Sequence, residues 1–151
     1  MTTQDTLAVF GAKYLFLAVV GISAVFFLRQ PRAVKRRMAT YAVVAWPLML
    51  VIARAIAHFY FDPRPFVVGG FQPLVPHEAD NGFPSDHALL CAAIASLLFP
   101  FDKKLSTVAW TLTILVGVSR VYVGIHHPID VFGSMTIAAT ISAIVYRSMA
   151  A

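Results

Sequence analysis

The stretch Ser119–Asp130, Ser-Arg-Val-Tyr-Val-Gly-Ile-His-His-Pro-Ile-Asp, separates two long apolar runs. Its polar residues therefore lie where one membrane helix ends and the next begins, and ionisable residues at such a depth are costly and usually functional. Pro128 suits the first turn of the second helix, because it lacks the N–H that would have no partner there. Asp130 then falls near the third helical position, from which its carboxylate can reach back towards His126. The stretch predicts an imidazole oriented by a carboxylate, which is a catalytic pair in many enzymes.

The composition places this chain in a membrane. Of its 151 residues, 59% are hydrophobic and 13% are charged, whereas about a quarter of the residues of soluble domains are charged. The formal charge is +5, but most basic residues stand in short gaps between apolar runs. That distribution indicates membrane topology and membrane lipid as a partner, not nucleic acid. We expect one integral membrane domain over residues 1–151.

Five apolar runs predict an all-α, polytopic transmembrane helix bundle of about five spans. The expected spans are Leu7–Leu28, Met38–Phe61, Asp86–Phe99, Leu105–Val123 and Ile129–Met149. The third has only 14 residues, against the roughly 20 that cross a bilayer. We therefore expect its polar start to be buried in protein. In the second span, Arg54 and His58 lie four residues apart on one face, which we expect to point into the bundle.

Charge predicts the orientation of these spans. The segment Arg29–Arg37 holds five cations in nine residues and is expected to be a loop. The Lys103–Lys104 turn and the C-terminus fall on the same side, which the positive-inside rule makes cytoplasmic. The loop Asp62–Ser85, rich in Pro and Gly and with room for a short surface helix, then lies outside.

Three polar clusters meet at that outer side. They are Asp62-Pro63-Arg64-Pro65, Gly82-Phe83-Pro84-Ser85-Asp86-His87 and Ser119–Asp130. Arginine suits phosphoryl oxygens, and a helix N-terminus that begins after Ser85 favours an anion. His87 lies in the first turn of that helix, so the clusters predict a phosphate cradle with one imidazole on each side.

Together the clusters resemble the signature of the type 2 phosphatidic acid phosphatase (PAP2) superfamily of membrane lipid phosphatases, whose patterns are K-x6-R-P, P-S-G-H and S-R-x5-H-x3-D. The third pattern is matched in full by Ser119, Arg120, His126 and Asp130. The second is matched by Pro84, Ser85 and His87, with Asp86 in place of the glycine. The first is matched only by Arg64-Pro65, because its lysine position falls on Ala57.

The resemblance implies a role for each matched residue. His126 would be the nucleophile that forms a phosphohistidine, and Asp130 would orient it. His87 would protonate the leaving group and then activate water. Phosphate would be bound by Arg64, Arg120 and Ser85. The resemblance implies no metal and no cofactor.

Several neighbouring residues have less definite roles. Asp86 lies at the phosphate site, where it would repel phosphate, so it is expected either to hold an arginine or to tune His87. Accessory contacts, in part replacing the missing lysine, are expected from Arg54, His58 and Ser119. His127 is interpreted as a polar helix-end residue. The loop residues His77, Glu78 and Asp80 are interpreted as solvated and not as a metal site.

The form Phe-Pro-Ser-Asp-His resembles the bacterial undecaprenyl pyrophosphate phosphatases of this superfamily, the BcrC-like group. It implies a hydrolase of cell wall biogenesis that converts undecaprenyl pyrophosphate to undecaprenyl phosphate and phosphate. The site would face outward, on the periplasmic side of the bacterial inner membrane. The alternatives are a phosphatidylglycerophosphate, phosphatidate or lipid A phosphatase, and a small transporter or proton channel with His126 and Asp130 as a relay. The oligomeric state is left open.

Overall fold

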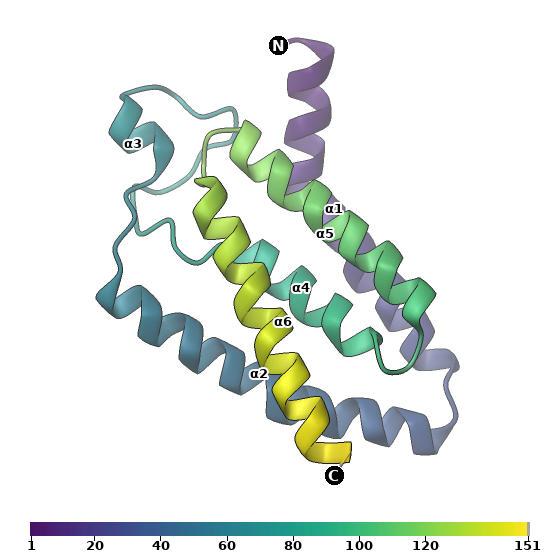
Figure 1. Ribbon diagram of the computed structural model, residues 1–151. Coiled ribbons are helices and arrows are strands. Elements are labelled where there is room, and N and C mark those ends of the chain that lie inside the picture. The colour runs from purple at the N-terminus through teal and green to yellow at the C-terminus, as the bar shows by residue number, and fades with distance from the viewer. Residues whose placement is uncertain (151) are drawn as a thin grey trace.

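The computed structural model describes residues 1–150, which form an all-helical bundle (Figure 1). The helices are α1 (Thr3–Arg29), α2 (Arg32–Phe59), α3 (Pro65–Gly69), α4 (Asp86–Leu98), α5 (Lys103–Tyr122) and α6 (Pro128–Ala150). Four of them, α1, α2, α5 and α6, are long and apolar enough to cross a membrane. The chain is a multi-pass membrane protein.

The short helix α4 forms the centre of the bundle and packs against α1, α2, α5 and α6. Every residue from Cys91 to Leu98 is buried, as expected for a helix that is apolar all round. Its 13 residues rise only about 20 Å, less than the roughly 30 Å of a hydrocarbon core, so α4 links the two ends of the bundle from a position buried among the longer helices. The expectation that its polar start is buried in protein is met only in part, because Ser85 is fully buried and His87 is half-buried, whereas Asp86 is exposed.

The basic segment after α1 is mostly helical, so the expected loop Arg29–Arg37 was wrong. Pro31 interrupts the chain after α1 and takes the position just before α2, which begins at Arg32. Ala, Lys and Arg are good helix formers, so nothing in the following residues stops the helix from starting there.

The face of α2 that carries Arg54 and His58 does not point into the bundle, and both residues are exposed. The buried stripe of α2 is Met38, Tyr41, Ala45, Met49 and Ala53. Arg54 follows Ala53 directly and is rotated away from that stripe by the helical repeat. The hydroxyl of Tyr41 fixes the stripe by donating to the carbonyl of Ser142 in α6 at 2.8 Å.

The three polar clusters gather at one end of the bundle, which we call the site end. It consists of residues 62–87 and 119–130. Figure 1 shows it opposite the C-terminus and the connection between α1 and α2. That other end, the basic end, consists of residues 29–37, 99–104 and 147–149.

The loop between α3 and α4 is docked onto the turn between α5 and α6. Leu74 N–H donates to the carbonyl of Val123 at 3.0 Å, and Phe71 packs against Gly124. Gly124 has a φ of 82°, which other residues rarely adopt. The expected short surface helix is α3, so the loop is more ordered than its content of Pro and Gly suggests.

Candidate active site

A histidine and a carboxylate lie at the centre of the site end. His126 Nδ1 is 3.3 Å from Asp130 Oδ2, and both side chains are buried. Asp130 is the third residue of α6, and its Oδ2 also accepts the backbone N–H of His127 at 2.9 Å. The structure therefore brings together the pair that the spacing predicts, with the carboxylate fixed by the start of its own helix.

Two buried arginines face the imidazole. Arg120 Nη2 lies 3.2 Å from His126 Nε2, and Arg64 Nη1 lies 3.4 Å from the same nitrogen and 3.5 Å from Nδ1. Arginine can only donate hydrogen bonds. The network therefore assigns the ring hydrogen to Nδ1, facing Asp130, and leaves the lone pair on Nε2.

The surroundings keep this imidazole neutral. Burial lowers the pKa of His126, Asp130 opposes that effect, and the charges of Arg120 and Arg64 lower the pKa further. A neutral ring with its lone pair directed at two cations has the form that a nitrogen nucleophile needs.

Both arginines are held by contacts from distant parts of the chain. Arg64 Nη1 donates to the carbonyl of Ile125 at 2.8 Å, and its Nε donates to Asp80 Oδ1 at 2.6 Å. Arg120 Nη1 donates to the carbonyl of Ala12 in α1 at 3.2 Å. Each guanidinium is therefore positioned before any substrate arrives.

Three polar side-chain atoms at the site end are buried without a hydrogen-bond partner in residues 1–150: Ser85 Oγ, Arg120 Nε and Asp130 Oδ1. Such a group typically costs about 1–3 kcal/mol when it stays unpaired. Ser85 takes the N-cap position of α4, but its hydroxyl makes no capping bond. Its backbone N–H donates instead to Ser134 Oγ at 2.9 Å. The hydroxyl of Ser85 and the guanidinium of Arg120 are thus free to bind an anion.

The second histidine lies beside this cradle. His87 is the second residue of α4, is half-buried, and packs edge-on against Phe16 of α1 with ring centroids 4.7 Å apart. Asp86 is exposed, and among the described residues it forms no ion pair. The hypothesis that Asp86 holds an arginine was wrong.

The three expected accessory residues do not join the cradle. Arg54 and His58 are exposed on α2, and the lysine position of the first pattern is Ala57. The carbonyl of Ala57 accepts a hydrogen bond from Asn81 Nδ2 at 3.2 Å. Ser119 packs against Gly11, where α1 and α5 approach so closely that no Cβ fits. Its position is explained by helix packing.

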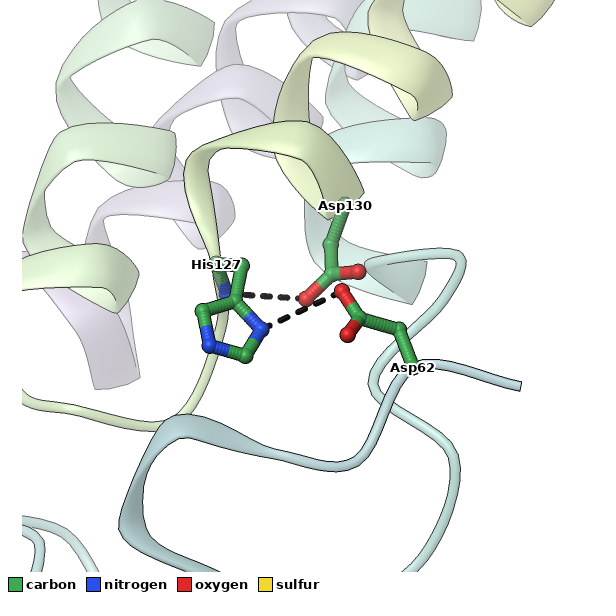
Figure 2. A group of neighbouring side chains, drawn as sticks. All are labelled: Asp62, His127 and Asp130. Atoms are coloured by element: carbon green, nitrogen blue, oxygen red, sulfur yellow. Dashed lines mark hydrogen bonds and ion pairs between the residues drawn. The ribbon is translucent and has the colours of Figure 1, made fainter. Parts of the chain in front are cut away.

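His127 links two carboxylates, as Figure 2 shows. Its Nδ1 lies 3.1 Å from Asp62 Oδ2, and its backbone N–H donates to Asp130. Ligand atoms of the three residues lie within 4.8 Å of one another, which is close enough for a metal ion. Both Oδ2 atoms are already engaged by histidine nitrogens, so the geometry is that of a hydrogen-bonded network. Burial, and then Asp130, raise the pKa of Asp62.

The loop residues His77 and Asp80 are exposed to solvent, as expected, but both also contact the site. Asp80 forms an ion pair with buried Arg64, whose hydrogen bond lowers the pKa of Asp80. The ring of His77 stands edge-on to that of His126, with centroids 6.3 Å apart. The sequence offered one indication of this contact: the loop joins the first two polar clusters, so it must pass close to the site.

Comparison with known proteins gives a consistent family. Residues 39–151 match the model of the PAP2 superfamily. Undecaprenyl-diphosphatase BcrC of Bacillus subtilis (strain 168) is 36% identical over 95% of this chain and 74% of its own length. Bacitracin transport permease protein BcrC of Bacillus licheniformis is 32% identical over 81% of this chain and 60% of its own length.

The fold itself has a solved counterpart. The crystal structure of Aquifex aeolicus LpxE superposes with a TM-score of 0.74 and covers 97% of this chain and 87% of that one. Its sequence is 22% identical, so this likeness concerns the fold alone.

Proposed function

This chain belongs to the PAP2 superfamily, and from that premise we propose that it removes a phosphate group from a membrane lipid through a covalent phosphohistidine. The observation that carries the proposal is the neutral, buried His126, whose Nε2 faces Arg64 and Arg120. Ser85 Oγ and Arg120 Nε, both buried without acceptors, complete a site for phosphoryl oxygens.

In the first step, the lone pair of His126 Nε2 attacks the terminal phosphorus, and the bond from phosphorus to the leaving oxygen breaks. His87 donates a proton to that oxygen, so the lipid leaves in its protonated form. Asp130 holds the ring hydrogen on Nδ1 and stabilises the positive charge that the imidazole acquires. Arg64 and Arg120 stabilise the charge on the phosphoryl oxygens, where removal of one such donor typically costs about 100- to 1000-fold.

In the second step, a water molecule attacks the phosphohistidine while His87, now neutral, takes its proton. The bond between phosphorus and nitrogen breaks, Nε2 recovers its electron pair, and inorganic phosphate leaves. Both steps use the same arginines, so the cradle serves the formation and the hydrolysis of the intermediate.

We take undecaprenyl diphosphate as the substrate, with undecaprenyl phosphate and phosphate as products. The Phe83–His87 stretch and the similarity to an undecaprenyl-diphosphatase support this choice. Such a reaction regenerates a lipid carrier and would belong to cell wall biogenesis. Phosphatidylglycerophosphate, phosphatidate and lipid A are the competing substrates.

We further propose that the chain lies in the bacterial inner membrane with the site end on the outer face. Seven exposed cations at the basic end support this orientation. They are Arg29, Arg32, Arg36, Arg37, Lys103, Lys104 and Arg147.

Cysteine labelling of intact cells tests the orientation, in a background where the one native cysteine, buried Cys91, is replaced by alanine. An impermeant maleimide should label Gln72→Cys at the site end and miss Ala33→Cys at the basic end, both positions being exposed. The opposite pattern would reverse the topology.

Phosphate release tests the activity. We would offer the purified protein undecaprenyl diphosphate, phosphatidylglycerophosphate and phosphatidate in detergent, with EDTA present. We expect release that is fastest with the diphosphate and is abolished in His126→Ala. Release that occurs only when EDTA is left out would show a required metal, for which the group in Figure 2 is the candidate site. No release from any lipid would favour the transporter, whose relay would be His126 and Asp130.

A further inference from the structure

Besides His127, which is paired with Asp62, His77 is the imidazole near the nucleophile that the proposed chemistry does not use. It lies in the loop between α3 and α4, and its ring stands edge-on to that of His126 with centroids 6.3 Å apart. The side chain is exposed, whereas His126 itself is almost completely buried. His77 therefore faces the nucleophile from the open side of the site.

The backbone holds His77 in this place. Val75, two residues earlier, is buried in a small cluster with Ala12, Val123 and Ile125. Leu74 N–H donates to the carbonyl of Val123, and Asp80, three residues later, is paired with Arg64. The loop is thus fixed on both sides of His77.

The ring also lies within electrostatic range of the phosphate-binding cations. Partial desolvation of the ring beside the site lowers the pKa of His77, and the charges of Arg64 and Arg120 lower it further. Its Nδ1 lies 3.4 Å from the carbonyl of Glu78, while Nε2 makes no hydrogen bond within residues 1–150. The ring is neutral in the free protein, and a bound anion that offsets the arginines would favour its protonation.

A diphosphate needs more positive charge than a monophosphate. The transferred phosphate occupies the cradle beside His126, and in-line attack places the leaving oxygen on the side away from Nε2. Arg64 already shares its charge with Asp80, so the buried residues leave the second phosphate without a full counter-charge. His77 is the exposed cation-forming side chain beside the cradle.

We propose that His77 binds the phosphate that is not transferred and so determines the preference of this enzyme for diphosphate over monophosphate lipids. This inference rests on the proposed function. It makes His77 a residue of substrate specificity, whereas His87 serves the proton transfers.

The test compares two substrates with one lipid tail, farnesyl diphosphate and farnesyl monophosphate, in His77→Gln. We expect kcat/KM to fall about tenfold for the diphosphate, the effect of one lost charged hydrogen bond, and less than about twofold for the monophosphate. His77→Lys restores a cation and should recover most of the preference. Glu78→Gln, at the exposed neighbouring position, is the matched control and should leave both values unchanged.

Inhibition gives the same comparison without turnover of the monophosphate. In His77→Gln the inhibition constant of inorganic diphosphate should rise about tenfold relative to that of orthophosphate. An equal loss on both substrates, or no loss on either, would overturn the role of His77 and leave the proposed function standing. Wild-type protein that hydrolyses neither farnesyl substrate nor undecaprenyl diphosphate would end both proposals.

Discussion

Arg120 and Arg36 both belong to long helices of the bundle, yet they lie in opposite settings. Arg120, at the site end, is 5% exposed and contacts His126 and the carbonyl of Ala12. Arg36, at the basic end, is exposed, and its side chain makes no ion pair or hydrogen bond within the described chain. Exposed cations at a membrane boundary set orientation, whereas a buried and positioned one has a cost that only a function explains.

The same contrast separates two adjacent histidines and predicts the largest effect. His126 is buried between two arginines, while His127 is partly exposed and paired with Asp62. His126→Ala should lower kcat by at least about a thousandfold, because the nucleophile is lost. His127→Ala should stay within about tenfold of wild type, since its backbone N–H still donates to Asp130. Steady-state phosphate release measures both, and a reversed order would reassign the nucleophile.

Exchanging arginine for lysine at each end sharpens the comparison. Arg120→Lys keeps the charge but loses the planar fork, and we expect kcat/KM to fall about a hundredfold. Arg36→Lys is the matched control and should change kcat/KM by less than about twofold. If both variants were equally active, the contacts of Arg120 would have no catalytic value.

Two glycines offer a smaller test of how tightly the site end is packed. A Cβ on Gly82 would lie 2.9 Å from Asp130 Oδ2 and 3.0 Å from the carbonyl oxygen of Asp62, whereas a Cβ on Gly21 meets nothing within 4 Å. Gly82→Ala should lower kcat about tenfold by displacing Asp130, because small misplacements at a reacting group are costly. Gly21→Ala should leave kcat unchanged. Circular dichroism would verify that both variants fold, and full activity of Gly82→Ala would mean that the position of Asp130 is not critical.

The pH dependence gives the smallest and most specific effect. Burial, Arg120 and Arg64 lower the pKa of His126, so its lone pair persists below the ordinary histidine pKa of about 6.5. Removing one cation in Arg64→Gln should raise that pKa and move the acid limb of kcat/KM to higher pH. Because the substrate is the same in both pH profiles, a shift of the acid limb between them reflects ionisation of the enzyme and not of the substrate. An unmoved limb would show that Arg64 does not act on the charge of His126.

The sequence predicted the residues whose positions follow from local rules. Asp130 was placed by the helix that Pro128 starts, and the short α4 by its length and apolar composition. Arg54 and His58 were misplaced because their spacing shows that they share a face but not which face the bundle buries. That depends on where α4 and α6 pack against α2.

The loop residues were missed for a different reason. The pairing of Asp80 with Arg64 spans 16 positions of irregular chain, and no periodicity reports such a contact. His77 reaches His126 only because Val75 is buried against α1 and the turn between α5 and α6. Both positions are set by tertiary packing, so the sequence showed only that the loop must pass the site.

The most direct test of the account is to trap the covalent intermediate on His126. The protein would be mixed with undecaprenyl diphosphate that is labelled in its terminal phosphate, and the reaction would be quenched in alkali within milliseconds. The protein would then be digested for mass spectrometry. We expect phosphate on the peptide that contains His126, and this phosphate should be stable to alkali and lost in acid. More of this phosphopeptide should accumulate in His87→Ala when the loss of His87 slows hydrolysis of the intermediate more than its formation. Phosphate on His127 or His87, or turnover with no phosphopeptide in either protein, would contradict the assignment of His126 as the nucleophile.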